Sequence, residues 1–276
     1  MKRPVLKTQW QLFLLAISFF TRLPVKHPTI SHETDLGGIN RYFSVVGILV
    51  GFLSGMLFYG MSLVLPISAA LILAMISAVL LTGGLHEDGL GDICDGFGGG
   101  TSKEKKLAIM KDSAIGAYGT LSLVLALMLK YQLLLMLAEH SAANGAVGVV
   151  ILYFILGQAI SRVVAGSISF SLPYARTIDS KMGAIVENPQ AKDLWILVLL
   201  GLLPLLFLDG TLAVTIVISM LVSRQLLIRL FRWQISGYTG DCLGATQQIT
   251  ELVCYLVLAA FLHSQTSVQS TLGQFL

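Results

Sequence analysis

Charged residues are scarce in this chain, and their scarcity excludes an ordinary soluble domain. Asp, Glu, Lys and Arg make up 12% of the 276 residues, whereas about a quarter is usual in soluble proteins. Apolar residues make up 55% of the chain. The composition therefore predicts an all-α integral membrane protein surrounded by membrane lipid, with no nucleic acid as a partner.

Cysteine is scarce as well. The three cysteines, Cys94, Cys242 and Cys254, show no CxxC spacing, so we expect neither a disulfide nor a zinc site. The chain also lacks internal repeats, linkers and low-complexity stretches. Residues 1–276 are therefore expected to form a single polytopic membrane domain.

Apolar runs predict about seven transmembrane helices. The second, fifth and seventh runs are shorter than the usual span of about 20 residues, so their boundaries are soft. The predicted spans are Phe43–Leu65, Ile67–Leu81, Gly119–Ala138, Ala146–Val164, Leu194–Leu208, Leu212–Leu230 and Leu252–Leu262.

The apolar run from Trp10 to Phe20 is only about half a bilayer long and has basic residues on both sides. We interpret it as an interfacial or re-entrant helix within a cytosolic and interfacial N-terminal segment, residues 1–42. A cleaved signal peptide is the alternative. It is disfavoured because Thr21-Arg22-Leu23-Pro24 is a poor cleavage site.

Lysine and arginine are unevenly distributed between the loops. All but one of the 18, Lys130, fall in the N-terminal segment, in alternate segments between the predicted spans, or in the last part of the span that leads into such a segment. Because such residues collect on the cytosolic side, the N-terminus is predicted inside and the C-terminus outside. Arg162, Arg224 and Arg229 lie at the ends of apolar runs and are expected to snorkel to the interface.

The most unusual segment runs from Gly83 to Gly100 and contains three aspartates and eight glycines. On a helix, Asp88, Asp92 and Asp95 would lie within an arc of roughly 60°. Carboxylates that close favour a hard divalent cation between them, Mg²⁺ or Mn²⁺, with Mg²⁺ the first choice. A solvated acidic loop is the alternative, and some of the glycines are expected only to allow close helix packing.

His86 precedes the aspartates in the same segment. On a continuous helix its side chain would point away from the aspartate face. A catalytic role for His86 therefore requires a break in the helix, and a supporting role next to the metal ligands is the alternative.

Basic and polar residues follow this segment. Lys111 and Asp112 lie shortly before the third predicted span, and phosphoryl transfer needs positive charge beside a carboxylate-bound metal. A substrate diphosphate fits this arrangement. Lys103, Lys105 and Lys106 are instead expected mainly to face lipid headgroups.

Two more segments on the predicted cytosolic side carry candidate residues. Thr239-Gly240-Asp241 again places an aspartate among glycines. Asp241 is a candidate metal ligand or base, with Thr239 as a polar contact, and a simple loop with an N-capping residue is the alternative. Arg176, with Lys181 beyond it, either supplies positive charge for phosphate or only sets the membrane topology.

In this order and spacing, the motifs resemble those of the adenosylcobinamide-GDP ribazoletransferase family, the cobalamin synthases. The resemblance covers essentially the whole chain. It rests on Ser18 to Val25, Gly83-Gly84-Leu85-His86, Asp88-Gly89-Leu90 with Asp92, Asp95-Gly96, Met110-Lys111-Asp112-Ser113, Tyr118-Gly119, Thr239-Gly240-Asp241, Leu243-Gly244-Ala245 and Glu251.

Four residues depart from the family's pattern. Glu87 stands in place of an apolar residue, Ala114 in place of a common arginine, and Ser44 in place of a common proline. Gln248 occupies a position that is often acidic. The three aspartates are intact.

The resemblance implies a transferase of cobalamin biosynthesis in the bacterial inner membrane, with its active site on the cytosolic face. It would transfer adenosylcobinamide phosphate from adenosylcobinamide-GDP to α-ribazole or its 5′-phosphate and release GMP. Whether it forms a homo-oligomer stays open. The implied site has Mg²⁺ at Asp88, Asp92 and Asp95, charge neutralisation by Lys111, substrate contacts from Lys111, Asp112, Arg176 and Thr239, and His86 or Asp241 as the general base.

Two other functions fit the sequence less well. CDP-alcohol phosphatidyltransferases also place aspartates and glycines on membrane helices, but in their motif an Asp-Gly pair is followed by x-x-Ala-Arg. Neither Asp88-Gly89 nor Asp95-Gly96 has that continuation. A cation transporter would carry acids in the middle of several spans, whereas nearly all the acids here lie in predicted cytosolic segments.

Overall fold

The computed structural model describes residues 5–25, 33–176 and 190–273, with side chains except at 5–8, 33–37 and 266–273. These residues form helices, and within them the only strand-like pairing is an isolated parallel bridge between Tyr174 and Tyr238. The predicted all-α fold is confirmed. The helices are α1 Val5–Phe20, η1 Glu33–Tyr42, α2 Phe43–Ser62, α3 Ile67–Thr82, α4 Leu85–Gly99, α5 Lys103–Ile109, α6 Ala117–Ala143, α7 Val149–Ile168, α9 Ala191–Leu202, η2 Leu203–Phe207, α10 Gly210–Ile235 and α11 Gly240–Gly273.

The number of spans differs from the seven predicted. Over the described ranges, five helical stretches are long and apolar enough to cross a membrane, and six if the bent pair α3 and α4 counts as one span. The predicted span Leu194–Leu208 is the 12-residue helix α9 followed by the short 3₁₀ helix η2. A count of seven is therefore not confirmed.

The last helix is much longer than its predicted span, Leu252–Leu262. Helix α11 is continuous from Gly240 to Gly273. The span predicted from hydropathy was too short because the polar residues Gln247, Gln248 and Glu251 lie in the first half of the helix. The structure buries all three inside the protein. Their polar atoms bind one another and residues of neighbouring helices, as membrane-buried polar groups must.

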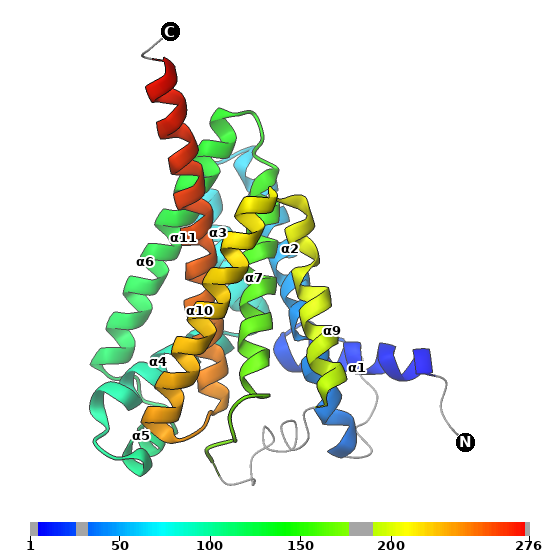
Figure 1. Cartoon of the computed structure of the whole chain (residues 1–276), viewed down its shortest axis with the longest axis vertical. Coiled ribbons are helices and arrows are strands. Elements are labelled where there is room, and N and C mark those ends of the chain that lie inside the picture. Colours follow the sequence, from blue (N-terminus) through cyan, green and yellow to red (C-terminus); the bar gives the residue numbers. More distant parts are fainter. Residues whose placement is uncertain (1–4, 26–32, 177–189, 274–276) are drawn as a thin grey trace.

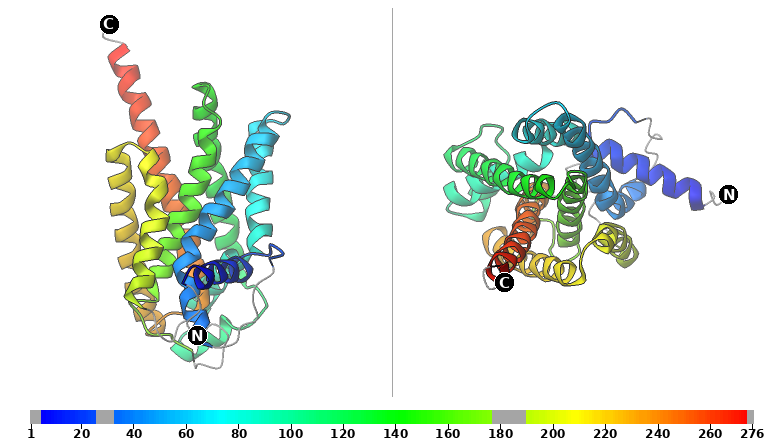
Figure 2. Two further views of the ribbon diagram at one scale, coloured as in Figure 1. Left: turned by 90° about the vertical axis from the view of Figure 1, so that its right-hand side faces the viewer. Right: turned by 90° about the horizontal axis from the view of Figure 1, so that it is seen from above.

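Helix α7 forms the centre of the bundle (Figures 1 and 2). Within this helix, 78% of the residues in an apolar stretch of 18 are buried. Helix α2 packs closely along it. Gly51 and Gly55 of α2 face α7 so closely that a Cβ atom at either position would lie within 2.6 and 2.8 Å of α7 backbone atoms. Small residues spaced by four allow such contact between membrane helices.

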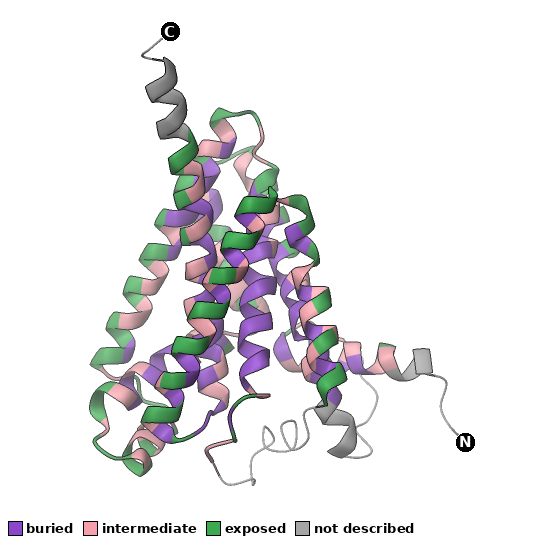
Figure 3. Ribbon diagram, viewed as in Figure 1, coloured by how far each residue is buried: buried purple, intermediate pink, exposed green. Residues whose placement is uncertain are grey.

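The outward faces of the other long helices are exposed (Figure 3), and they carry many large apolar side chains. On α6, Leu121, Leu125 and Met128 are each more than 60% exposed. Large apolar side chains exposed along several helices indicate contact with lipid. The chain is thus a multi-pass membrane protein.

Two helices lie across the bundle axis (Figure 1). Helix α1 does so, as expected for an interfacial helix. Helix α4 follows α3 after a turn of two glycines, Gly83 and Gly84, whose φ angles of 71° and 74° are left-handed and favour glycine. The turn sets α3 and α4 at 86° to each other, so α4, with all three predicted aspartates, lies at one end of the bundle with α5.

Candidate active site

Asp88 and Asp92 lie on α4, and both interact electrostatically with Asp241 at the start of α11. Asp88 is exposed and Asp92 half-buried. Burial, followed by the negative charges of Asp241 and Asp88, raises the pKa of Asp92 to about 7, although Arg176 acts in the opposite direction. The cluster therefore holds more negative charge than its surroundings neutralise.

Direct backbone contact between α4 and α11 brings these carboxylates together. A Cβ atom at Gly89 would lie 2.8 Å from the carbonyl oxygen of Asp241, and one at Gly244 would lie 3.2 Å from the Cα atom of His86. Because those obstacles are backbone atoms, no larger residue fits without moving the helices. The expectation that some glycines permit close packing applies to this crossing.

Arg176 joins two more segments to the cluster. Its Nη2 donates to Asp241 Oδ2 at 2.8 Å and to the carbonyl oxygen of Met110 at 3.3 Å. Paired backbones hold Arg176 in place, since the Ala175 N–H donates to the Tyr238 carbonyl at 2.8 Å. Lys181, also noted in the sequence, lies outside the described residues.

Thr239 contacts both Asp241 and the start of α11. Its hydroxyl donates to Asp241 Oδ2 at 3.2 Å, and its oxygen accepts from the Cys242 N–H at 3.4 Å. The N-capping interpretation and the polar-contact interpretation therefore describe the same side chain. Asp241, predicted in a loop, lies in the first turn of the helix.

Among the described residues, the carboxylate of Asp95 binds backbone amides of another helix, unlike those of Asp88 and Asp92. One carboxylate oxygen accepts from the Gly116 N–H at 2.7 Å, and the other accepts from the Gly119 N–H at 2.9 Å. These amides lie at the beginning of α6, where unpaired N–H groups favour a negative charge. Asp95 caps that helix, and its role as a metal ligand stays a prediction.

The variant Asp95→Asn separates these two roles. If capping dominates, loss of the charge lowers the thermal stability of the purified protein, by about 1 kcal/mol, and leaves the Mg²⁺ concentration for half-maximal activity unchanged. A thermal melt and an Mg²⁺ titration of activity measure both. A rise of tenfold or more in that Mg²⁺ concentration would identify Asp95 as a metal ligand.

Lys111 and Asp112 lie in the exposed turn after α5, next to the Met110 carbonyl that Arg176 contacts. Asp112 Oδ1 accepts from the Ala114 N–H at 3.0 Å, which shapes the turn. In the part of the chain that the structure describes, neither side chain forms a hydrogen bond or an ion pair with Asp88 or Asp92. The structure thus places them at the margin of the cluster.

His86 does not join the aspartates. Helix α4 is continuous from Leu85 to Gly99, so the break that His86 needed is absent. The imidazole is 3% exposed and stacks on Phe43, with ring centroids 5.8 Å apart. Burial and then the positive charges of Arg162 and Lys130 hold its pKa well below the usual value, which makes it a weak base.

The prediction that Arg162 snorkels to the interface is wrong. Arg162 is fully buried in α7, and its Nη1 donates to the backbone carbonyl of Gln158 at 2.8 Å. Lys130, the exception to the cation pattern, is buried too and pairs with Glu251 at 2.9 Å. Its position in the middle of a span was the signal that could have revealed this pair.

The donor chemistry of the cluster suits a hard cation, but the protein supplies only part of a coordination shell. Within the described ranges, no three His, Cys, Asp or Glu side chains lie close enough to hold a metal ion by themselves. Mg²⁺ commonly binds one or two carboxylates and completes its shell with water and substrate phosphates. Asp88 and Asp92 fit that mode of binding.

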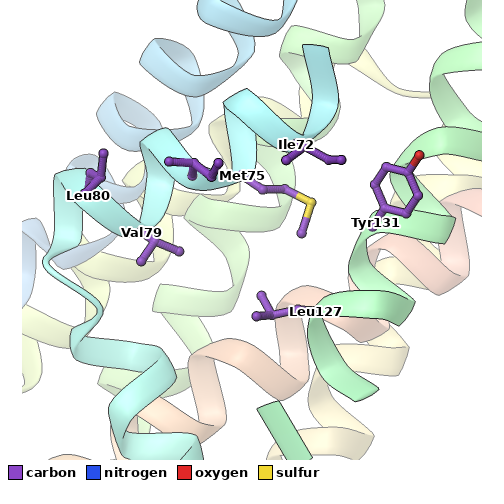
Figure 4. Close-up of a pocket in the computed structure, with 7 residues that line it drawn as sticks. Ile72, Met75, Val79, Leu80, Leu127 and Tyr131 are labelled. Atoms are coloured by element: carbon purple, nitrogen blue, oxygen red, sulfur yellow. The ribbon is translucent and has the colours of Figure 1, made fainter. Parts of the chain in front are cut away.

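A separate pocket of about 260 Å³ lies between α3 and α6 (Figure 4). Its lining carries no acid or base and consists of Ile72, Met75, Ile76, Val79, Leu80, Leu127 and Tyr131. It offers nothing for phosphoryl chemistry, so the acidic cluster remains the candidate site.

Comparisons with known proteins agree on one family. Residues 12–259 match the family model described as cobalamin-5-phosphate synthase. The chain is 47% identical to an adenosylcobinamide-GDP ribazoletransferase from Shewanella frigidimarina, over 91% of this chain and 95% of that protein. It is 46% identical to one from Shewanella amazonensis, over 91% of this chain and 96% of the relative. No solved structure matches.

Proposed function

The chain belongs to the cobalamin-5-phosphate synthase family, and we propose that the acidic cluster at the crossing of α4 and α11 is its active site. The protein is an enzyme of cobalamin biosynthesis that uses adenosylcobinamide-GDP for ribazole transfer. One observation carries the proposal: Asp88, Asp92, Asp241 and Arg176, from three distant segments, meet at one end of the bundle.

Asp88 and Asp92 would hold Mg²⁺ against the diphosphate of adenosylcobinamide-GDP. When bound, the ion neutralises charge on the reacting phosphate and on the leaving GMP. The raised pKa of Asp92 supports this assignment, because a carboxylate that is partly buried and lies beside other carboxylates retains a proton when no cation is bound. Arg176 and Lys111 add positive charge beside the same phosphates, and Asp112 and Thr239 border the site.

The transfer needs a base for the attacking hydroxyl of α-ribazole or its 5′-phosphate. The hydroxyl oxygen forms a bond to the corrinoid-side phosphorus, the bond from phosphorus to the bridging oxygen breaks, and GMP leaves with that oxygen. Of the two candidates, Asp241 adjoins Asp92, whereas His86 faces away from it. We assign proton acceptance to Asp241, which Arg176 and Thr239 orient.

The end of the bundle that carries α4 and α5 is proposed to face the cytosol from the bacterial inner membrane. Exposed Lys105 and Lys111 lie at this end, as the positive-inside rule requires. A cysteine introduced at Lys105 should react with a membrane-impermeant maleimide in inside-out vesicles, whereas one at Glu139 should not. The reverse labelling pattern would refute this orientation.

The direct test of the function is an assay with the purified full-length protein in lipid nanodiscs. With adenosylcobinamide-GDP, α-ribazole and Mg²⁺, we expect equal amounts of GMP and a cobalamin product. Chromatography with mass detection measures both, and α-ribazole 5′-phosphate is compared as the acceptor. Release of GMP without a cobalamin product would show hydrolysis in place of transfer and would reject the proposal.

The pKa of Asp92 makes Mg²⁺ use dependent on pH. Below pH 7 the raised pKa leaves this carboxyl protonated, so a cation must displace the proton. The Mg²⁺ concentration for half-maximal activity should rise by up to about tenfold per pH unit below 7 and level off above it. Mg²⁺ titrations at several pH values measure this, and equal values throughout would contradict it.

A further inference from the structure

Next to the acidic cluster, a continuous chain of hydrogen bonds joins six side chains inside the bundle. Glu251 lies at its centre and accepts from Gln158 at 2.7 Å and from Lys130 at 2.9 Å. Gln248 accepts from Lys130 at 3.0 Å and donates to Glu87 at 2.9 Å. In order, the chain is Arg162, Gln158, Glu251, Lys130, Gln248 and Glu87.

Both ends of this chain carry buried polar atoms without a hydrogen-bond partner among the described residues. At one end these are Nε and Nη2 of Arg162, whose side chain is fully buried and whose guanidinium carbon lies 5.5 Å from the centroid of the Phe43 ring. At the other end they are Oε2 of Glu87 and Nε2 of the neighbouring His86. Buried donors and acceptors are rarely left unpaired, because an unmade hydrogen bond costs free energy.

The two ends are complementary in chemistry and close in space. Arg162 offers two donors, Glu87 offers an acceptor, and the charges of the two residues interact. The six side chains include two cations, Arg162 and Lys130, and two carboxylates, Glu87 and Glu251, so their formal charge is balanced. A charged ligand would disturb that balance, whereas a neutral one would preserve it.

We propose that Arg162, His86 and Glu87 form a buried subsite for a neutral group that both accepts and donates hydrogen bonds. A primary carboxamide has this chemistry, since its carbonyl oxygen accepts from Arg162 and its NH₂ donates to Glu87 and His86. An ordered water molecule has it as well. A carboxamide as the bound group rests on the proposed function, in which the corrinoid substrate brings carboxamide side chains to the site.

The position of the subsite explains what it would do for the reaction. Glu87 directly precedes Asp88 on α4, so a group bound to Glu87 is held one residue from the proposed diphosphate site. Contacts with this remote group would strengthen binding of the corrinoid substrate equally before and during the reaction, which lowers KM and leaves kcat unchanged. Arg162, His86 and Glu87 are thus binding residues for the substrate.

A structure of the full-length protein in nanodiscs, with and without adenosylcobinamide-GDP, decides whether the subsite exists. We expect density that bridges Arg162 and Glu87. Density continuous with bound substrate identifies a carboxamide, and a discrete peak in both states identifies water. Absence of bridging density in both states overturns the proposal.

Kinetics of the Glu87→Gln variant distinguish a carboxamide of the substrate from an ordered water molecule as the bound group. This variant keeps the contact with Gln248 but replaces the free acceptor by a donor. For a substrate carboxamide, KM for adenosylcobinamide-GDP rises by roughly tenfold or more, while kcat and the KM for α-ribazole stay within about threefold. Arg162→Lys tests the other end of the chain, and Glu139→Gln, exposed on α6, is the matched control.

Each kinetic result has one meaning. A selective rise in KM supports the substrate source, and unchanged constants together with a discrete water peak support the water source. A fall in kcat without a change in KM would indicate disturbed packing of α4 and would overturn a substrate subsite. Wild-type protein that makes no cobalamin product would instead refute the proposed function, whatever the variants do.

Discussion

Replacing Asp92 by asparagine is expected to reduce GMP release by at least roughly a hundredfold. Burial, followed by the negative charges of Asp241 and Asp88, raises the pKa of Asp92 to about 7. Asparagine keeps the shape of the side chain but removes the charge that would bind a cation. The loss should therefore appear in catalysis and leave the fold intact.

GMP release by purified protein, measured at limiting and at saturating Mg²⁺, tests this expectation. Excess Mg²⁺ should restore only part of the activity, because asparagine binds Mg²⁺ weakly through its amide oxygen. Glu139→Gln removes an exposed carboxylate from α6 and serves as the control, with activity near that of the wild type. Near-wild-type turnover of Asp92→Asn at limiting Mg²⁺ would exclude a metal role for this residue.

Replacing Gly89 by alanine is expected to cost almost as much activity, although the change adds a single methyl group. That group would lie 2.8 Å from the carbonyl oxygen of Asp241 and 3.2 Å from the Cα atom of Gly244. Since backbone cannot rotate away, α4 and α11 must separate. Misplacement of reacting groups by about 1 Å can cost roughly a hundredfold in rate.

Gly91 provides a matched control two residues along the same helix. The atoms nearest to a Cβ atom there belong to the side chains of Leu123 and Ile115, and the closest of them, Leu123 Cδ1, would lie at 3.5 Å, which is an ordinary contact. Alanine also favours helix over glycine by up to about 1 kcal/mol, so Gly91→Ala should be as active as the wild type and at least as stable. Equal activity of the two variants would show that the close crossing of α4 and α11 does not position the site.

The sequence predicted the class of fold better than it predicted individual helices. Apolar runs located α2, α6, α7 and α10, because these helices are apolar along most of their length, whether they face lipid or, like α7, the interior of the bundle. The same signal failed for the first half of α11, whose buried residues include the polar Gln247, Gln248 and Glu251. It also failed for α9, which combines with η2 where one long span was expected.

Helical spacing placed Asp88, Asp92 and Asp95 on one side of α4, but it could not show what each carboxylate meets. The amides that occupy Asp95 come from Gly116 and Gly119, which are remote in sequence. The contact between Arg176 and Asp241 likewise depends on tertiary structure. Long-range pairing of this kind leaves no periodic signal in a sequence.

Two departures from the family pattern acquire a physical meaning in the structure. Glu87 and Gln248 hydrogen-bond to each other, although they are 161 residues apart in the chain. In the sequence alone, Glu87 adds a carboxylate where the family usually has an apolar residue, and Gln248 lacks a carboxylate where the family often has one. Together they place the acid on α4 and its amide partner on α11, which keeps the buried polar network connected.

Binding of Mn²⁺, used as a paramagnetic substitute for Mg²⁺, tests the central claim most directly. The measurement is an electron paramagnetic resonance titration of wild-type protein and Asp92→Asn, each with and without adenosylcobinamide-GDP. The proposed site predicts tight binding of one ion by the wild type with the substrate present, weaker binding without it, and loss of the tight site in Asp92→Asn. Equal binding by both proteins in the presence of adenosylcobinamide-GDP would contradict a metal site at the crossing of α4 and α11.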